Sequence, residues 1–141
     1  MTSSRRAGRV TLAAIAALSL QLAAAPLMAL TPADLAFRQA VAESAAEEDA
    51  VAGFYREHDY ATLWTSGADA ARRAALFAAL DGAWGHGLPA DRYGTEALRR
   101  KFQTVSSERE RGLLEVETTR AFLTYARDVQ TGLVTPSKVD P

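Results

Sequence analysis

The amino-acid sequence predicts an all-α fold, a single small domain of about five or six helices that follows an N-terminal signal peptide. Three observations support this prediction. Apolar residues recur at helical spacing in several stretches, most clearly from Ser107 to Gly132. Helix-capping residues stand before these stretches, and glycines stand after them. No stretch shows a convincing alternation of apolar and polar residues of the kind that marks a strand.

The stretch from Ser107 to Gly132 is expected to be the longest helix and the centre of the bundle. Ser107 and Glu110 have the spacing of a capping box, and Gly132 stands where a left-handed stop belongs. Apolar residues cover much of the circumference, as is usual for a helix at the centre of a small bundle. These residues are Leu113, Leu114, Val116, Ala121, Phe122, Leu123, Tyr125, Ala126 and Val129.

Two helical stretches are predicted near the start of the domain. Thr31 is the expected cap of the first, with Pro32 at its first position and Asp34 near its positive end. The second covers residues 47–58, where Gly53 is a candidate for close packing. The sequence leaves open whether the two form one helix with an irregular joint.

Two more helices are predicted before the central one. Residues 68–84 form an amphipathic helix that ends at the glycines around His86, and Thr95 is the expected cap of a helix that runs to about Val105. The inward face of the first is predicted to comprise Ala75, Leu76, Ala79, Leu80 and Ala83. Trp64, Leu80, Phe122 and Tyr125 are predicted to be buried together.

Composition excludes several kinds of function. The chain has 141 residues and a formal net charge of −1, so nothing in it suggests a nucleic-acid partner. It contains no cysteine. This excludes a disulfide framework, a thiolate metal site and a cysteine nucleophile in this chain.

Residues 1–29 have the pattern of a secretory signal peptide. Arg5, Arg6 and Arg9 form a basic start, residues 10–22 form a mostly apolar h-region, and a small-residue site ends at Ala29. Cleavage near Ala29 would leave residues 30–141 as an exported, periplasmic domain. The alternative is an uncleaved membrane anchor, and this segment is the only expected contact with a membrane.

The residues by themselves show no catalytic apparatus. His58 and His86 are the only histidines and lack the spacing of two ligands on one helix, so no metal site and no cofactor are expected. The aromatic residues could line a groove for a sugar or a peptide, although such residues more often form the core of a small domain. The residues singled out as a possible murein or partner contact are His86, Trp84, Tyr93 and Trp64.

Three segments in order resemble one known family. They are FYREHDYATLW at 54–64, the helix at 75–84 followed by HGLPADRY at 86–93, and TRAFLTYARDVQTGLVTP at 119–136. Together they resemble the N-terminal scaffold domain of the L,D-transpeptidases, which build cross-links in bacterial cell-wall peptidoglycan. The resemblance covers residues 50–136.

The resemblance implies a non-catalytic role for this chain. Enzymes of that family transfer an acyl group through a cysteine nucleophile in a separate catalytic domain, and no cysteine is present here. We therefore expect the scaffold portion of such an enzyme, truncated before the catalytic domain and inactive alone. Its expected partners are peptidoglycan or the missing catalytic domain, and no family catalytic residue can be assigned.

Two alternatives remain open at this point. Residues 76–103 resemble a small three-helix peptidoglycan-binding module, although the usual D-G-x-F/Y-G turn is replaced by Asp91-Arg92-Tyr93-Gly94. That module explains neither residues 54–64 nor the last helix. The other alternative is a periplasmic helical adaptor for a protein partner.

Overall fold

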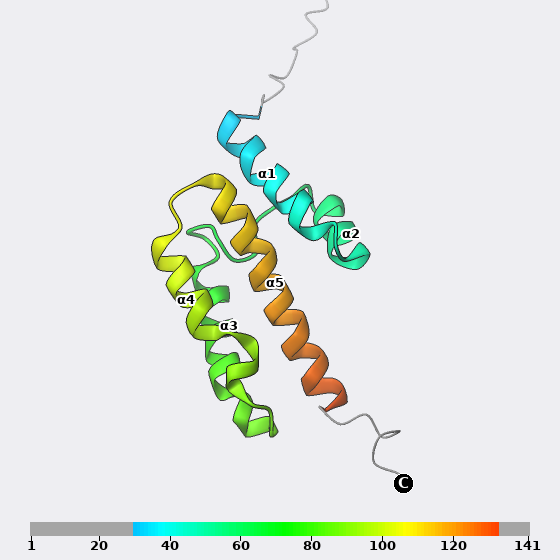
Figure 1. Ribbon diagram of the computed structural model, residues 1–141, viewed down its shortest axis with the longest axis vertical. Coiled ribbons are helices and arrows are strands. Elements are labelled where there is room, and N and C mark those ends of the chain that lie inside the picture. The colour runs from blue at the N-terminus through cyan, green and yellow to red at the C-terminus, as the bar shows by residue number, and fades with distance from the viewer. Residues whose placement is uncertain (1–29, 133–141) are drawn as a thin grey trace, which may run out of the picture.

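A computed structural model describes residues 30–132, and in this range the protein is all-α, as predicted (Figure 1). The predicted signal peptide at 1–29 and residues 133–141 lie outside the described residues. The helices are α1 (Pro32–Ala45), α2 (Asp49–Glu57), α3 (Ala70–Asp81), α4 (Thr95–Thr104) and α5 (Glu108–Thr131), with the 3₁₀ helices η1 (Gly82–His86) and η2 (Ala90–Tyr93) between α3 and α4.

Capping boxes fix the N-terminal ends of α1 and α5. Ser107 accepts a hydrogen bond from the Glu110 backbone N–H, and the Glu110 carboxylate accepts one from the Ser107 N–H, which completes the predicted capping box of α5. Thr31 and Asp34 form the same arrangement at α1, with Pro32 as its first residue. Gly132 has the positive φ expected after α5, 72°, but its ψ of 171° is extended rather than left-handed helical.

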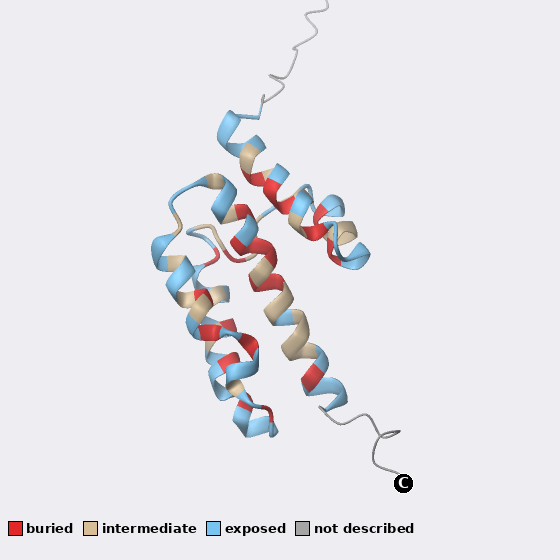
Figure 2. Cartoon of the chain, viewed as in Figure 1, coloured by how far each residue is buried: buried red, intermediate tan, exposed pale blue. Residues whose placement is uncertain are grey.

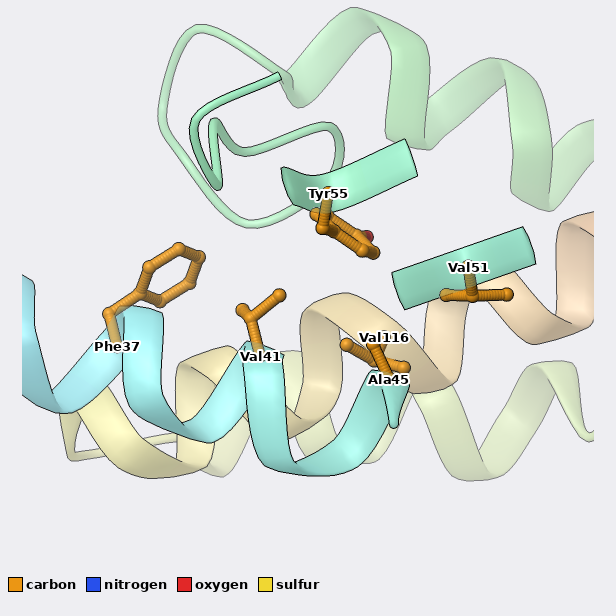
Figure 3. Close-up of a cluster of buried hydrophobic side chains, with 6 residues drawn as sticks. All are labelled: Phe37, Val41, Ala45, Val51, Tyr55 and Val116. Atoms are coloured by element: carbon orange, nitrogen blue, oxygen red, sulfur yellow. The ribbon is translucent and has the colours of Figure 1, made fainter. Parts of the chain in front are cut away.

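Helix α5 separates two groups of helices. Figure 1 shows α1 and α2 on one side of α5, and α3 and α4 on the other. Each side has its own core, and Figure 2 shows buried residues on both sides of α5 and on α5 itself. The first core comprises Phe37, Val41, Ala45, Val51, Tyr55 and Val116 (Figure 3). The second comprises Trp64, Leu76, Leu80, Ala83, Leu88 and Tyr93.

Helix α1 packs closely against α5 at Gly112. A Cβ atom at this position would lie 2.6 Å from the backbone oxygen of Phe37 and 2.8 Å from Cβ of Ala40, so only glycine lets α1 approach this closely. The prediction that Gly53 marks close packing is wrong, because a Cβ atom there would have no neighbour within 4 Å.

Helices α1 and α2 are separate, which answers the question that the sequence left open. α1 ends at Ala45, and α2 begins at Asp49. Arg120 of α5 fixes the joint, since its guanidinium donates to the backbone oxygen of Ser44 at 2.7 Å and pairs with Glu47 and Glu48.

Several sequence expectations about single residues need correction. Ala75 is exposed rather than inward-facing, and the helix that was expected to reach Trp84 is α-helical only to Asp81, with a 3₁₀ turn after it. Thr95 is not a cap. The residue before it, Gly94, occupies the cap position in the left-handed conformation, and Thr95 is the first helical residue.

The prediction that four side chains are buried together is only partly correct; these are Trp64, Leu80, Phe122 and Tyr125. Trp64 and Leu80 are buried, whereas Tyr125 is half-buried and Phe122 is 40% exposed. Phe122 still contacts the tryptophan, with ring centroids 5.7 Å apart. Figure 1 shows that the C-terminal part of α5 extends past α1 and α2.

Between residues 30 and 132, no helix combines the length and the apolar character that crossing a membrane requires.

Candidate functional site

The most densely bonded side chain among the described residues is Glu115, a carboxylate buried completely in the middle of α5. Its Oε1 accepts from the backbone N–H of Leu63 at 2.6 Å, and its Oε2 accepts from the backbone N–H and the hydroxyl of Thr65 at 3.1 and 2.7 Å. The Trp64 N–H and the Tyr55 hydroxyl are longer donors, at 3.3 Å each. Glu115 thus holds the turn that carries the tryptophan against α5.

The same turn is held from its other side by two arginines of α3. Arg72 donates to the backbone oxygen of Leu63 at 3.1 Å, and Arg73 donates to that of Trp64. The N–H groups of the turn therefore meet a carboxylate, and its carbonyl groups meet guanidinium groups. This arrangement satisfies backbone groups that would otherwise be costly to bury.

Thr119, one turn after Glu115, fixes the aromatic side chains around this turn. Its hydroxyl oxygen accepts from the indole N–H of Trp64 at 2.8 Å and lies 2.6 Å from the Tyr55 hydroxyl. Burial raises the pKa of the Tyr55 hydroxyl, and the charge of Glu115 adds to that effect. Trp64 is therefore a fixed core residue, which lies 5% exposed.

A second buried carboxylate, Asp128, organises the far end of α5. It accepts from Arg92 Nε at 2.7 Å and from the Tyr93 hydroxyl at 3.1 Å, and both donors belong to η2. Burial raises the pKa of Tyr93, and its hydrogen bond to Asp128 contributes further. The Tyr93 ring packs edge-on against Tyr125 with centroids 5.4 Å apart.

Trp84 and His86 differ from the other two predicted contact residues, because they lie on the surface. Trp84 is 76% exposed, the highest fraction among the large apolar residues between 30 and 132. His86 is also exposed and lies edge-on to Tyr125, with centroids 6.4 Å apart. Gly87, with a φ of 72°, turns the chain directly after them.

The four predicted contact residues therefore form two layers. Tyr93 and Trp64 are buried in the second core, and Trp84 and His86 lie outside it on η1. Tyr125 connects the layers, since its ring contacts both Tyr93 and His86. The role of these residues as a murein or partner contact remains a prediction.

His58 does not form a pair with its neighbour Asp59. Its ring stacks on Phe54 with centroids 4.2 Å apart, and its Nδ1 lies 2.8 Å from the backbone oxygen of the same residue. The Asp59 carboxylate instead pairs with Arg38 of α1, and this bond lowers the pKa of Asp59. Across residues 30–132, no group of three or more possible metal ligands comes together.

Sequence reasoning missed Glu115 and Asp128. Both are acidic residues within the apolar face of a helix, in LLEVE and YARDV, and that position is the one signal that could have found them. Their partners could not be predicted, since Glu115 binds residues 50 or more positions away in the chain. Glu117, two residues after Glu115, is instead partly exposed and pairs with Lys101.

Comparison with known proteins gives one match. Residues 49–141 match the protein family described as Scaffold domain, and this range takes in all three segments that resemble the L,D-transpeptidase scaffold. No curated protein and no solved structure matches the chain. The match begins at the first residue of α2 and covers more than half of the chain. The chain belongs to the Scaffold domain family, in agreement with its resemblance to the scaffold domain of the L,D-transpeptidases.

Proposed function

We propose that this chain is the non-catalytic scaffold portion of an exported murein L,D-transpeptidase, with a role in peptidoglycan cross-linking and cell-wall biogenesis. The observation that carries the proposal is the family match over residues 49–141, which includes the three segments typical of that scaffold. The signal-peptide pattern at 1–29 supports a periplasmic location.

A positioning role agrees with the chemistry of the described residues. The acyl transfer of these enzymes needs a thiolate, and the chain has no cysteine. Its buried polar groups serve instead to hold segments in place, Glu115 for the Trp64 turn and Asp128 for η2. A side chain with this many internal bonds has little capacity left for a substrate.

The surface that we assign to murein contact is the η1 end, with Trp84 and His86. An exposed tryptophan ring offers a flat apolar face on which a sugar ring can stack, and the exposed His86, two residues later on η1, can form hydrogen bonds. Tyr125 and Tyr93 support this end from behind. Trp64 belongs to this supporting layer rather than to the contact surface.

Sedimentation with purified sacculi tests the proposal. We expect the chain to sediment with sacculi, and the Trp84→Ala variant to be retained much less. Leu35→Ala is the matched control, because Leu35 is also a large exposed apolar residue, 53% exposed, but lies on α1. Retention no better than that of an unrelated acidic protein would remove the murein-binding role. We also expect no transpeptidase or carboxypeptidase turnover of muropeptides by the chain alone.

A further inference from the structure

Arg92 of η2 is anchored by a buried carboxylate through only one of its nitrogens. Its Nε donates to Asp128 Oδ2 at 2.7 Å, and the Tyr93 hydroxyl donates to the same oxygen at 3.1 Å. The Asp128 side chain is 9% exposed, whereas that of Arg92 is 48% exposed. Among residues 30–132, the two terminal nitrogens of Arg92 have no hydrogen-bond partner. The buried pair therefore orients a guanidinium group whose outer edge can still donate two parallel hydrogen bonds.

Arg92 lines a cleft of about 270 Å³ between the η2–α4 segment and α5. Gly94 and Ala97 line the same side as Arg92, and Ala121 and Thr124 line the side of α5. Thr124 precedes Asp128 by one turn of α5, so it lies on the face that holds Arg92. The cleft thus combines a charged donor and a hydroxyl with side chains small enough to leave room for a ligand.

The charged groups along the cleft favour an anion. Glu117 is the only acid among its lining residues, and Lys101 neutralises it, with the ammonium nitrogen 2.6 Å from both carboxylate oxygens. Arg120 lines the cleft but is already paired at the α1–α2 joint. Gly94 starts α4 without a side-chain cap, so the positive end of this ten-residue helix also borders the cleft. Arg92 is the cation that remains for a ligand.

The lining selects a carboxylate that is attached to a small apolar group. A carboxylate matches the two parallel N–H groups of a guanidinium. Ala97, Leu98 and Ala121 offer no hydrogen-bonding side chain, so a sugar would lose water there without gaining partners. Phosphate would also pair with Arg92, but it has no apolar part to place against the alanines. The free carboxylate end of a peptide whose last side chain is small meets both conditions.

We propose that this cleft binds the free carboxylate end of a short peptide. The two terminal nitrogens of Arg92 hold the carboxylate, the Thr124 hydroxyl donates a further hydrogen bond, and the last side chain lies against Ala97 and Ala121. Neither Trp84 nor His86 lines the cleft, so this site is distinct from the murein contact that we assign to η1 and does not depend on it.

Titration of the full chain with N-acetyl-alanyl-alanine tests the site, and the C-terminal amide of the same peptide is the uncharged comparison. The readout is the position of backbone amide signals in NMR spectra. The acid should cause saturable shifts at residues 92–97 and 120–124, and the amide should cause none. Inorganic phosphate is the third probe and should bind more weakly than the acid, because it makes no apolar contact.

Two variants locate the binding in this cleft. Arg92→Gln should weaken binding of the acid at least about tenfold, since hydrogen bonds to a charged group are lost. Arg100→Gln is the matched control, because Arg100 is an exposed arginine of α4 that does not line the cleft, and this variant should bind as the unchanged chain does. Arg92→Gln also removes the bond to Asp128. Ala97→Leu therefore provides a second test, because it fills the cleft while Arg92 stays in place, and it should abolish binding.

The proposal is overturned if the acid does not bind, if the amide binds equally well, or if either cleft variant binds undiminished. Phosphate that binds as tightly as the acid would also overturn it, because the cleft would then be a general anion site. The sacculus experiment is a separate measurement, so loss of the murein contact at η1 and loss of peptide binding in the cleft can be told apart.

Discussion

At the scale of single residues, Glu115 is the clearest case of a charge used to build structure. It is fully buried, and among the described residues its contacts are hydrogen-bond donors rather than a cation. Short hydrogen bonds to a carboxylate are roughly twice as strong as neutral ones, so the turn at Leu63–Thr65 is held by a few strong contacts. Removal of the carboxylate would leave several backbone N–H groups without partners.

Glu115→Ala should therefore lower the free energy of unfolding by about 3 kcal/mol or more, since each buried donor left unsatisfied costs about 1–3 kcal/mol. Urea denaturation followed by tryptophan fluorescence measures this loss. Glu117→Gln is the control, because this exposed residue pairs with Lys101 on the surface and its loss should cost less than about 1 kcal/mol. Equal losses for the two variants would mean that the turn does not depend on Glu115.

Gly53 of α2 and Gly112 of α5 should respond in opposite ways when each is replaced by alanine. Gly112→Ala would place a Cβ atom 2.6 Å from the Phe37 backbone oxygen, so α1 must move, at a cost of about 1–3 kcal/mol. Gly53→Ala meets no neighbour within 4 Å and should stabilise α2 by about 0.5–1 kcal/mol. Melting temperatures of the two variants should shift in opposite directions, and a shift in the same direction would contradict the packing at Gly112.

At the scale of helices, the outcome of sequence reasoning depends on the range of the interactions involved. The start of α5 and the start of α1 could be predicted, because Ser107 with Glu110 and Thr31 with Asp34 form bonds within one turn. The exposure of Phe122 could not, because periodicity shows that a face is apolar but not how far along the helix a neighbour covers it.

In the candidate site, too, local features could be predicted from the sequence and long-range contacts could not. The resemblance of three segments identified the family, and the candidate aromatic residues occur in those segments. The sequence did not separate buried Trp64 and Tyr93 from exposed Trp84 and His86. That distinction depends on residues of α5 that hold the first two, the Thr119 hydroxyl for Trp64 and the Asp128 carboxylate for Tyr93. Glu115 itself was assigned no role, because its donors come from residues far away in the sequence.

Helix α1 lies outside the family match and yet is part of the folded domain. The match begins at residue 49, whereas Phe37 and Val41 of α1 are buried in the first core with Val116 of α5. Burial of these two side chains contributes about 3–6 kcal/mol in total, which is comparable to the whole stability of a small domain.

A chain of residues 49–141 should consequently lose its cooperative thermal transition or melt far below a chain of residues 30–141. Circular dichroism of the two chains measures the difference. A milder control is Val41→Ala, which keeps the helix but removes part of its buried side chain and should give an intermediate loss of stability. A melting temperature unchanged by removal of α1 would show that α2 to α5 form the complete folding unit.

At the scale of the whole molecule, acidic side chains connect segments that lie far apart in the sequence. The Arg38 guanidinium lowers the pKa of Asp59, and the amide of Gln39 together with Arg109 lowers that of Glu43. Hydrogen bonds within one turn, from Ser106 and Ser107, also lower the pKa of Glu110. Each of these carboxylates is more acidic in the folded state, so each stabilises the fold while it is ionised.

These lowered pKa values determine how the stability of the fold changes at low pH. The stabilisation is complete above the pKa of the unfolded chain, about 4, and is lost as the pH falls through the lower pKa values of the folded state. The urea midpoint should fall steadily below about pH 4, and Asp59→Asn should make that fall shallower. The control is Asp91→Asn, which removes a carboxylate without a described hydrogen bond and should leave the fall of the urea midpoint with pH unchanged. If the midpoint of the Asp59 variant also fell as steeply as that of the unchanged chain, the role of the Asp59 pair with Arg38 would be contradicted.

At alkaline pH the domain depends on its tyrosines. The chain has two lysines, so few other groups lose charge near pH 10. Burial raises the pKa of Tyr55 and of Tyr93, which means that the folded state favours their neutral form. Their contribution is therefore complete below the unfolded pKa of about 10 and is lost as the pH rises towards the higher folded values.

Tyr55→Phe should lower stability at pH 7, because the hydroxyl contact with Thr119 is lost, but should weaken the further decline between about pH 10 and 12. Tyr60→Phe is the matched control for that decline. If both variants declined as steeply as the unchanged chain, the buried tyrosine would not be the group that limits stability in alkali.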